Sequence, residues 1–354
     1  MTESEFQTQS DSTQSTQAWQ AEEKPPMQGE FSDHCTQLKR DYLKLIRKMV
    51  GRCALLLLIL AVVTQALGVG IQYFIQNSSL AISDGMVSYF TSYFPCILGE
   101  LITMMIAIPL LKPTFSNEVF CKPQESGVFI LMGVLGCLGA ANIGAYVLTQ
   151  LLTMLELWGV SYRIFDLEMP TDSWLSMLLC ASYICLIGPI FEEIIFRGLL
   201  LKAIQPFGEM TAIIISAVAF AMFHLNPMQF PTALATGLLL GYLAVRTKSI
   251  FPSMLAHIVN NSARALPGFM FSDVLSPLSI LFNVLISVVG MVGILIFVYK
   301  FGRGFTNYLK YEDVSIVPVG KKLLHASINV RSILYILLFL LFTCYMIYFY
   351  FIAF

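Results

Sequence analysis

The chain has 354 residues, of which 57% are hydrophobic and 12% are charged, and its mean hydropathy is +0.74. A water-soluble domain of this length does not need so much apolar surface for its core, so the composition excludes an ordinary globular protein and indicates a membrane protein. The formal net charge of −1 gives no electrostatic reason to expect a nucleic-acid partner.

The N-terminal part divides into a polar tail and a basic collar. Residues 1–38 are rich in Ser, Thr, Gln and Glu without apolar periodicity, so we predict a disordered tail that contains no signal peptide. The collar consists of Lys39, Arg40, Lys44, Arg47, Lys48 and Arg52. A hydrophobic run begins at Cys53 and is long enough to cross ~30 Å of hydrocarbon. Because positive charge collects on the cytoplasmic side, the collar predicts a cytoplasmic N-terminus.

Further apolar runs predict an all-α, polytopic transmembrane bundle of eight or nine membrane segments. These runs occupy roughly residues 88–111, 127–153, 174–202, 211–226, 230–245, 249–263, 277–300 and 332–353. With nine crossings, the loops 112–126, 203–210, 246–249 and 301–331 face the cytoplasm. Three of them hold Lys and Arg residues, namely Lys112, Lys122, Arg246, Lys248, Arg303, Lys310, Lys321, Lys322 and Arg331, whereas the opposite loops, 76–87 and 154–173, hold Arg163 alone. The nine-crossing arrangement therefore fits the positive-inside bias.

We expect four parts along the chain. They are the tail (1–38), the collar with the first membrane helices (39–170), a core of helices that carries the chemistry (171–265), and C-terminal membrane helices with a basic cytoplasmic loop (266–354). The eight cysteines are scattered and form no CxxC pair, so we interpret them as small hydrophobic side chains.

Three charged residues lie close together at the end of an apolar run, namely Glu192, Glu193 and Arg197. A charge near the bilayer centre costs on the order of 2.5–3.5 kcal/mol, so it rarely persists without a partner or a task. On a helix, Glu193 and Arg197 share a face and can form a salt bridge, whereas Glu192 is rotated by about 100° and lacks that partner. This arrangement suits a structural ion pair beside a general base, although a solvated helix end would contain the same residues.

Two of the four histidines, His224 and His257, fall in apolar segments. A lone intramembrane histidine is usually a packing residue. Asn261, however, follows one helical turn after His257, so the two side chains can aim hydrogen-bonding groups at one point. Depths estimated at about 1.5 Å per residue allow these segments and the glutamate segment to converge in the cytoplasmic half of the membrane or near its midplane.

Three motifs follow one another along the chain: Glu192-Glu193-x-x-x-Arg197, Phe220-x-x-x-His224 and His257-x-x-x-Asn261. In this order, over roughly residues 170–265, they resemble the signature of the CPBP family. That family includes the type II CAAX prenyl proteases and many bacterial immunity-type proteins. The resemblance implies that Glu192 and His224 hold and activate an attacking water, and that His257 and Asn261 stabilise the oxyanion. Peptide hydrolysis needs a base and preplaced donors of these types.

By the same resemblance, the remaining motif residues support the site: Glu193, Arg197 and Phe220. A metal site is an open alternative, because Glu192, His224 and His257 are an accepted set of zinc ligands. The HExxH spacing of zincins is absent. The favoured mechanism does not require a metal, and the cofactor stays undetermined.

Other polar residues in the apolar runs have no assigned task. For Glu100 and Asn142 we favour hydrogen bonds between helices over a place in the cavity wall. Asn260 and Arg264 either contribute to the site or mark its exit toward the membrane interface.

The expected function is therefore that of an intramembrane endopeptidase of the cell membrane. Its expected partners are membrane lipid and a small hydrophobic, lipidated or leader-bearing peptide. In the CAAX branch of the family the reaction removes the last three residues of a prenylated protein, whereas bacterial members process bacteriocins or peptide pheromones or confer self-immunity. The rivals are a catalytically silent scaffold, which would lack a motif residue, and a transporter, which would show an inverted repeat. The sequence has neither feature.

Overall fold

The computed structural model describes residues 27–111, 119–159, 172–271, 275–313 and 315–351. Within these ranges the regular structure is entirely helical, with no strand. The chain divides into two compact units, Met1–Tyr42 and Leu43–Phe354. Residues 27–38, which we assigned to the polar tail, are helical, and residues 1–26 lie outside the described ranges.

The helices follow one another as long, mostly continuous segments. The first half contains α1 (Met27–Gln76), the joined pieces α2 (Asp84–Ser88), η1 (Tyr89–Tyr93) and α3 (Phe94–Leu111), and then α5 (Gly127–Leu157). One bent segment then comprises α6 (Trp174–Ser182), η2 (Tyr183–Ile187), α7 (Gly188–Glu193), η3 (Ile194–Leu201), α8 (Lys202–Ile204) and η4 (Gln205–Phe207). The remainder is α9 (Glu209–Phe223), α10 (Phe230–Thr247), α11 (Phe251–Met270), α12 (Pro277–Asp313), α13 (Val319–Ser327) and α14 (Val330–Phe351).

Several helices begin where the sequence supplies a cap. The hydroxyl groups of Ser83, Ser126 and Ser173 accept hydrogen bonds from backbone N–H groups in the first turns of α2, α5 and α6. These bonds satisfy donors that have no partner inside the helix. α10 and α11 instead carry a proline in their first turn, where the missing N–H costs nothing.

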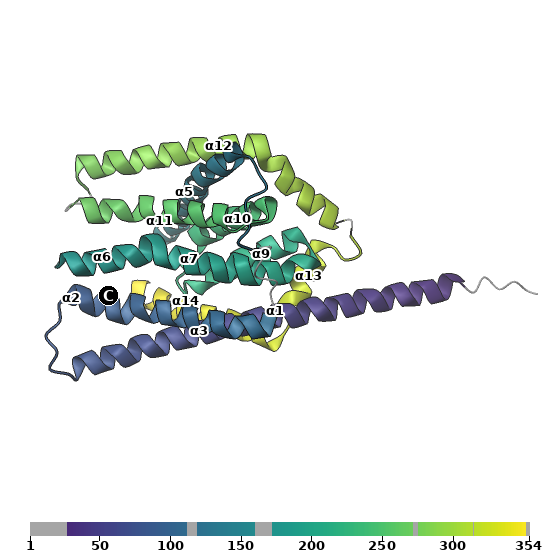
Figure 1. The fold of residues 1–354 in the computed structure, drawn as a ribbon, viewed down its shortest axis with the longest axis horizontal. Coiled ribbons are helices and arrows are strands. Elements are labelled where there is room, and N and C mark those ends of the chain that lie inside the picture. Colours follow the sequence, from purple (N-terminus) through teal and green to yellow (C-terminus); the bar gives the residue numbers. More distant parts are fainter. Residues whose placement is uncertain (1–26, 112–118, 160–171, 272–274, 314, 352–354) are drawn as a thin grey trace, which may run out of the picture. The chain divides into compact units, whose positions relative to one another are not determined.

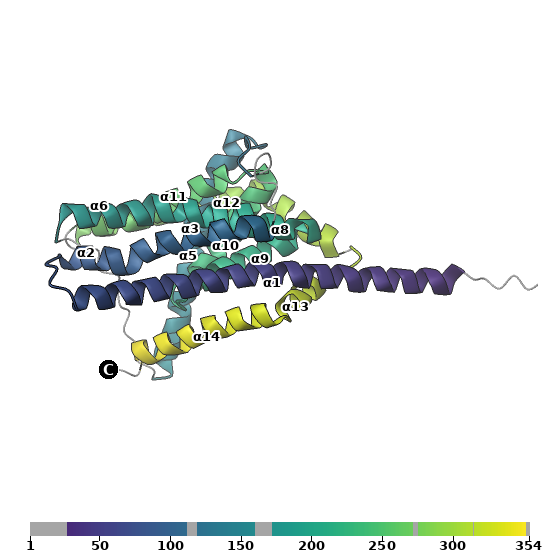
Figure 2. The ribbon, with the colours of Figure 1, turned by 60° about the horizontal axis from the view of Figure 1, so that its bottom comes forward.

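In the second unit, α5 packs against α12 and α10, and α9 lies between α10 and the pair α13 and α14 (Figures 1 and 2). The contact of α5 with α12 depends on small residues. A Cβ atom on Gly290 would lie 2.8 Å from the backbone nitrogen of Gly139 and 2.9 Å from the side chain of Leu138. Such close backbone approach is how helices associate where lipid provides no hydrophobic driving force.

Six of the described helices are long and apolar enough to cross a membrane, which is fewer than the eight or nine segments that we expected. They are Asp33–Gln76, Asp84–Leu111, Gly127–Leu157, Trp174–Phe207, Pro277–Asp313 and Val330–Tyr348. The larger count is therefore not confirmed. The other three apolar runs form α9, α10 and α11. α9 has 15 residues, about 22 Å of helix, and α11 carries polar residues of the candidate site.

Loops that are distant in sequence meet at the ends of these helices. At one end, Arg246 Nε lies 2.8 Å from Glu125 Oε1 and the Ser249 hydroxyl donates to the Cys121 carbonyl over 2.6 Å. The expected cytoplasmic loops 112–126 and 246–249 thus adjoin each other in their described parts. The expected loop 301–331 is largely helical, because α12 runs to Asp313 and α13 follows it.

A separate contact joins the N-terminal ends of α2 and α6. The Gly85 N–H donates to Asp172 Oδ2 over 2.8 Å, and the Ser176 hydroxyl donates to the other carboxylate oxygen over 2.8 Å. The bond from Gly85, followed by those from Ser83 and Ser176, lowers the pKa of Asp172 to about 2. A group with a lowered carboxylate pKa stabilises the fold at pH values above its ordinary pKa. This stabilisation is lost as the pH falls through the lowered pKa, so the contact persists until strongly acidic pH.

Glu312 holds the start of α9 in place from the far end of α12. Its carboxylate accepts from the backbone N–H groups of Met210 and Thr211 over 2.8 and 3.2 Å and from the Thr211 hydroxyl, and it pairs with Lys322 Nζ at 3.0 Å. Gly208 lies directly beneath it with φ of 132°, and a Cβ atom there would collide with the Glu312 carboxylate. This buried carboxylate therefore caps α9 and links three helices.

We expect Gly208→Ala to lower the free energy of unfolding by about 1–3 kcal/mol, through backbone strain and displacement of Glu312. Thermal unfolding of the detergent-purified protein measures the effect. Gly320→Ala in α13 is the matched control, because no heavy atom lies within 4 Å of a Cβ atom there. Equal melting temperatures for the two variants would contradict the proposed role of Gly208.

Candidate active site

The glutamate motif lies on the bent segment that runs from Trp174 to Phe207. Two stretches of π-helix, η2 and η3, flank the short α7 that ends in Glu192 and Glu193. A π-helical turn adds a residue and redirects side chains, and such turns occur frequently at functional sites. From the sequence we expected a regular α-helix here, because the apolar pattern contains no signal for the π-helical stretches.

Glu193 is the centre of a fully buried set of polar contacts. Its Oε1 accepts from Arg197 Nη1 over 2.7 Å, which is the ion pair expected from the four-residue spacing. The same oxygen lies 3.0 Å from Nδ1 of His257 on α11. Since an ionised carboxylate can only accept, Nδ1 carries a proton in this contact. Glu193 therefore orients the histidine as well as neutralising the arginine, a second role that the spacing alone did not indicate.

Arg197 has no exposed surface and contacts two other helices, α10 and α9. Its Nη2 donates to the carbonyl of Gly237 on α10 over 3.3 Å, and its guanidinium carbon lies 4.6 Å from the ring centroid of Phe220 on α9. The Phe220 ring also meets the rings of His224 and His257 edge-on, at centroid distances of 5.1 and 5.4 Å. Phe220 thus contacts a residue from each of the three motifs.

Glu192 lies on the other side of His257. Its side chain is largely buried, and Oε2 lies 3.5 Å from His257 Nε2 without a hydrogen bond in the described structure. We expected Glu192 to lack the arginine partner, and it does. Beside it lies instead the histidine that Glu193 positions, so one imidazole separates the two carboxylates.

His224 and Asn261 face a cavity of about 380 Å³. His224 is the C-terminal cap of α9, and Asn261 donates from Nδ2 to the carbonyl of Ile184 in η2 over 3.2 Å. His257 also lines this cavity, whereas neither glutamate is among its lining residues. The structure thus brings both histidines and Asn261 to one cavity, and Glu192 lies 3.5 Å from one of its lining residues, His257. In the described chain no hydrogen bond or ion pair joins Glu192 directly to His224.

Residues without an assigned task form a chain of hydrogen bonds beside the cavity. Arg264 donates from Nη2 to Asn142 Oδ1 over 3.1 Å and from Nε to Asn260 Oδ1 over 3.4 Å. Asn260 in turn donates to Asn261 Oδ1 over 3.3 Å, and Asn142 donates to the carbonyl of Ser287 on α12 over 3.1 Å. Asn142 therefore links helices, as expected, while Asn260 and Arg264 belong to the cavity wall and hold Asn261.

Glu100 also joins two helices, since the hydroxyl of Tyr183 donates to its Oε1 over 3.2 Å and its side chain is fully buried. It does not line the cavity. Glu100 is recognisable in the sequence as a carboxylate within an apolar run, whereas Tyr183 is not, because a tyrosine in such a run carries no signal of its own.

The zinc alternative requires Glu192, His224 and His257 to gather around one point. Among the described residues, no group of three or more His, Cys, Asp or Glu side chains is placed to hold a metal ion. His257 presents Nε2 toward Glu192, and His224 lies across the Phe220 ring. The arrangement does not fit a three-ligand metal centre.

Residues 173–263 match the family model of Rce1-like type II CAAX prenyl endopeptidases. This match is consistent with the CPBP family, and it contains the three motifs from Glu192 to Asn261. No curated protein and no solved structure gives a significant match. Together with several apolar helices long enough to cross a membrane, the family match supports a multi-pass membrane endopeptidase of this type.

Proposed function

We propose that this protein hydrolyses a peptide bond of a small membrane-associated peptide, lipidated or leader-bearing, with a water activated by Glu192 and His224. The observation that carries the proposal is the convergence of His224, His257 and Asn261 on one cavity, with Glu192 3.5 Å behind His257, within the segment that matches the endopeptidase family. We place the protein in a cell membrane.

In this mechanism Glu192 is the general base. Its Oε2 is free of protein hydrogen bonds, so it is available to take a proton from water as the water oxygen attacks the peptide carbonyl carbon. A carboxylate and an imidazole that share one water do not need to touch each other, which agrees with the absence of a direct bond between Glu192 and His224 in the described chain. When the C–N bond breaks, the proton passes to the leaving amine.

His257 and Asn261 stabilise the oxyanion of the tetrahedral intermediate. Asn261 uses one Nδ2–H to reach the Ile184 carbonyl and has a second to donate, and its Oδ1 is fixed by Asn260. Since His257 donates from Nδ1 to Glu193, it can donate to the oxyanion from Nε2 only when both ring nitrogens carry a proton. Preplaced donors of this kind stabilise charge that develops in the transition state.

The proposal is tested with purified protein and two synthetic substrates, a farnesylated peptide that ends in a CAAX sequence and an unlipidated leader-bearing peptide. Mass spectrometry of the products locates the cleaved bond. Cleavage of either peptide supports the endopeptidase, and the preferred peptide names the substrate class. Binding of both without any cleavage would instead favour a catalytically silent scaffold or self-immunity protein.

We expect Asn261→Ala to lower turnover by about 10²–10³-fold with little change in KM, the usual loss on removing one oxyanion donor. Asn283→Ala is the matched control, because among the described residues Asn283 donates to the Ser279 carbonyl of its own helix alone and does not line the cavity. A tightly bound zinc that is lost on His257→Ala would contradict this role and revive the metal alternative.

We also expect the collar and the loops around residues 119–126, 246–250 and 315–329 to face the cytoplasm. The contact of Arg246 with Glu125 puts two of these loops at one end of the helices, where lysines and arginines concentrate. In intact cells, a single cysteine introduced at Ser315 should resist a membrane-impermeant maleimide, whereas one at Ser79 should react. External labelling at Ser315 would overturn this orientation.

A further inference from the structure

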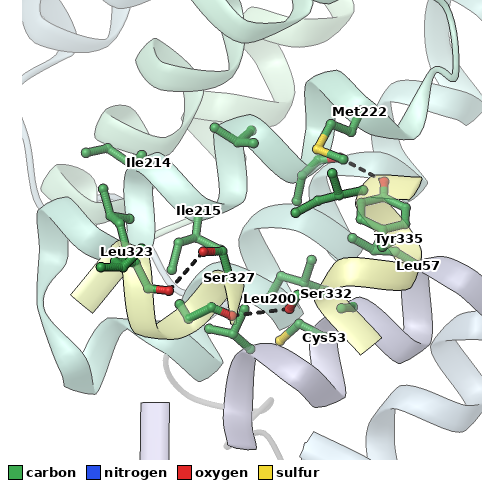
Figure 3. A pocket seen from close by; sticks show the side chains of 17 residues that line it. Cys53, Leu57, Leu200, Ile214, Ile215, Met222, Leu323, Ser327, Ser332 and Tyr335 are labelled. Atoms are coloured by element: carbon green, nitrogen blue, oxygen red, sulfur yellow. Dashed lines mark hydrogen bonds between the residues drawn. The ribbon is translucent and has the colours of Figure 1, made fainter. Parts of the chain in front are cut away.

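Behind the active-site helix α9 lies a second cavity, of about 500 Å³, that plays no part in the proposed chemistry (Figure 3). Its wall comes from α1, η3, α9, α13 and α14, and includes Cys53, Leu57, Leu200, Ile215, Met222 and Tyr335. Its volume is within the range of ordinary ligand pockets. The cavity and all of its lining residues belong to the second compact unit.

The few polar groups in this wall are already satisfied. The Tyr335 hydroxyl donates to the Ala219 carbonyl over 3.2 Å, and the Ser327 and Ser332 hydroxyls donate to backbone carbonyls over 2.9 and 3.3 Å, as the dashed lines in Figure 3 show. The cavity therefore offers a ligand only apolar contact. Hydrocarbon is the chemistry that such a wall accepts at least cost.

A basic recess of about 340 Å³ adjoins the apolar cavity on the same helices. Its lining residues are Lys44, Arg47, Lys48, Gly51, Asn329, Val330 and Arg331. Four of these are cations and none is an acid. Among the described residues, Arg47, Lys48 and Arg331 have no carboxylate partner. An anionic group is the complement of this surface.

The two cavities follow one another along α1 and along the turn before α14. On α1, Gly51 lines the basic recess, while the nearby Val50 and Cys53 line the apolar cavity. Around the turn before α14, the residues from Asn329 to Arg331 line the basic recess, and Ser327 and Ser332 on either side line the apolar cavity. From Arg47 to Leu57 the helix advances about 15 Å. The charged end lies where the basic collar precedes the apolar run, and we expect lipid head groups at such a boundary.

We propose that an anionic phospholipid binds along this seam, with its phosphate against Arg47, Lys48 and Arg331 and an acyl chain in the apolar cavity beside α9. Basic pockets between membrane helices recognise anionic head groups in this way. The lipid stabilises α9 from the side opposite Phe220 and His224, so it supports the position of the helix without entering the reaction. This inference does not depend on the proposed peptidase activity.

The test measures lipid binding by native mass spectrometry and thermal unfolding on the detergent-purified full chain, with phosphatidylglycerol, phosphatidylcholine or glycerol phosphate added. We expect phosphatidylglycerol alone to bind stoichiometrically and to raise the melting temperature. The variant Arg47→Gln/Lys48→Gln/Arg331→Gln should bind it about 10²-fold more weakly. The matched control Arg303→Gln/Lys310→Gln/Lys321→Gln removes the same charge from exposed residues outside both cavities and should bind normally.

Three outcomes would overturn the proposal. Equal weakening in the two triple variants would mean that net charge alone attracts the lipid. An equal rise in melting temperature with phosphatidylcholine would mean that the site does not recognise an anionic head group. Equal stabilisation by glycerol phosphate would mean that the site binds the anion alone and that the acyl chain contributes nothing.

Discussion

Glu192→Gln is expected to lower peptide-bond hydrolysis by about 10²–10⁴-fold, the usual contribution of a general base, while the protein remains folded. Glutamine has nearly the same volume as glutamate but cannot accept a proton at neutral pH. The fold should tolerate the change, because Glu192 Oε2 has no hydrogen bond in the described structure and meets only His257 Nε2, at 3.5 Å. Single-turnover kinetics with the preferred peptide, together with thermal unfolding, measure both effects.

Glu100→Gln is the matched control for this experiment, because Glu100 is a second buried carboxylate and accepts a hydrogen bond from Tyr183, whereas Glu192 lies beside His257. It should retain most of the activity. If Glu192→Gln cleaves the peptide as fast as the unaltered protein, then Glu192 is not the base, and His224 becomes the group to examine.

Glu193→Gln should act mainly on stability, lowering the free energy of unfolding by about 3–5 kcal/mol. The substitution leaves the Arg197 guanidinium, which has no exposed surface, without a counter-ion at 2.7 Å. The remaining contacts of Arg197, with the Gly237 carbonyl and the Phe220 ring, do not neutralise its charge. Activity should fall as well, because His257 loses the carboxylate that orients Nδ1.

The double variant Glu193→Gln/Arg197→Met separates the two effects. Removing both charges eliminates the uncompensated buried cation, so part of the lost stability should return, while activity stays low because His257 is still without its carboxylate. Glu192→Gln is the control, as the same substitution on the adjacent residue. Equal melting temperatures for Glu192→Gln and Glu193→Gln would contradict the division of labour between the two carboxylates.

Much of this arrangement was predictable from the sequence, since lipid imposes strong and local requirements on a chain. Long apolar runs must form helices that satisfy their own backbone, and a charge inside such a run needs a partner or a task. These rules led to an all-helical membrane protein and to the ion pair of Glu193 with Arg197. They also drew attention to His224, His257 and Asn261, and the order of the three motifs pointed to the family that residues 173–263 match.

Only the tertiary structure decided how these residues share their contacts. Three of these contacts depend on how separate helices cross. Glu193 bonds to both Arg197 and His257, Phe220 touches all three motifs, and Arg264 links Asn142 to Asn260. The angle at which two helices cross is set by packing over many residues, so it cannot be read from the spacing of a few residues in the sequence. For the same reason, the π-helical turns around Glu192 and the Glu312 cap on α9 have no sequence signal. The amino-acid sequence by itself determined which side chains lipid cannot leave unpaired, and the tertiary structure decided with which partners they pair.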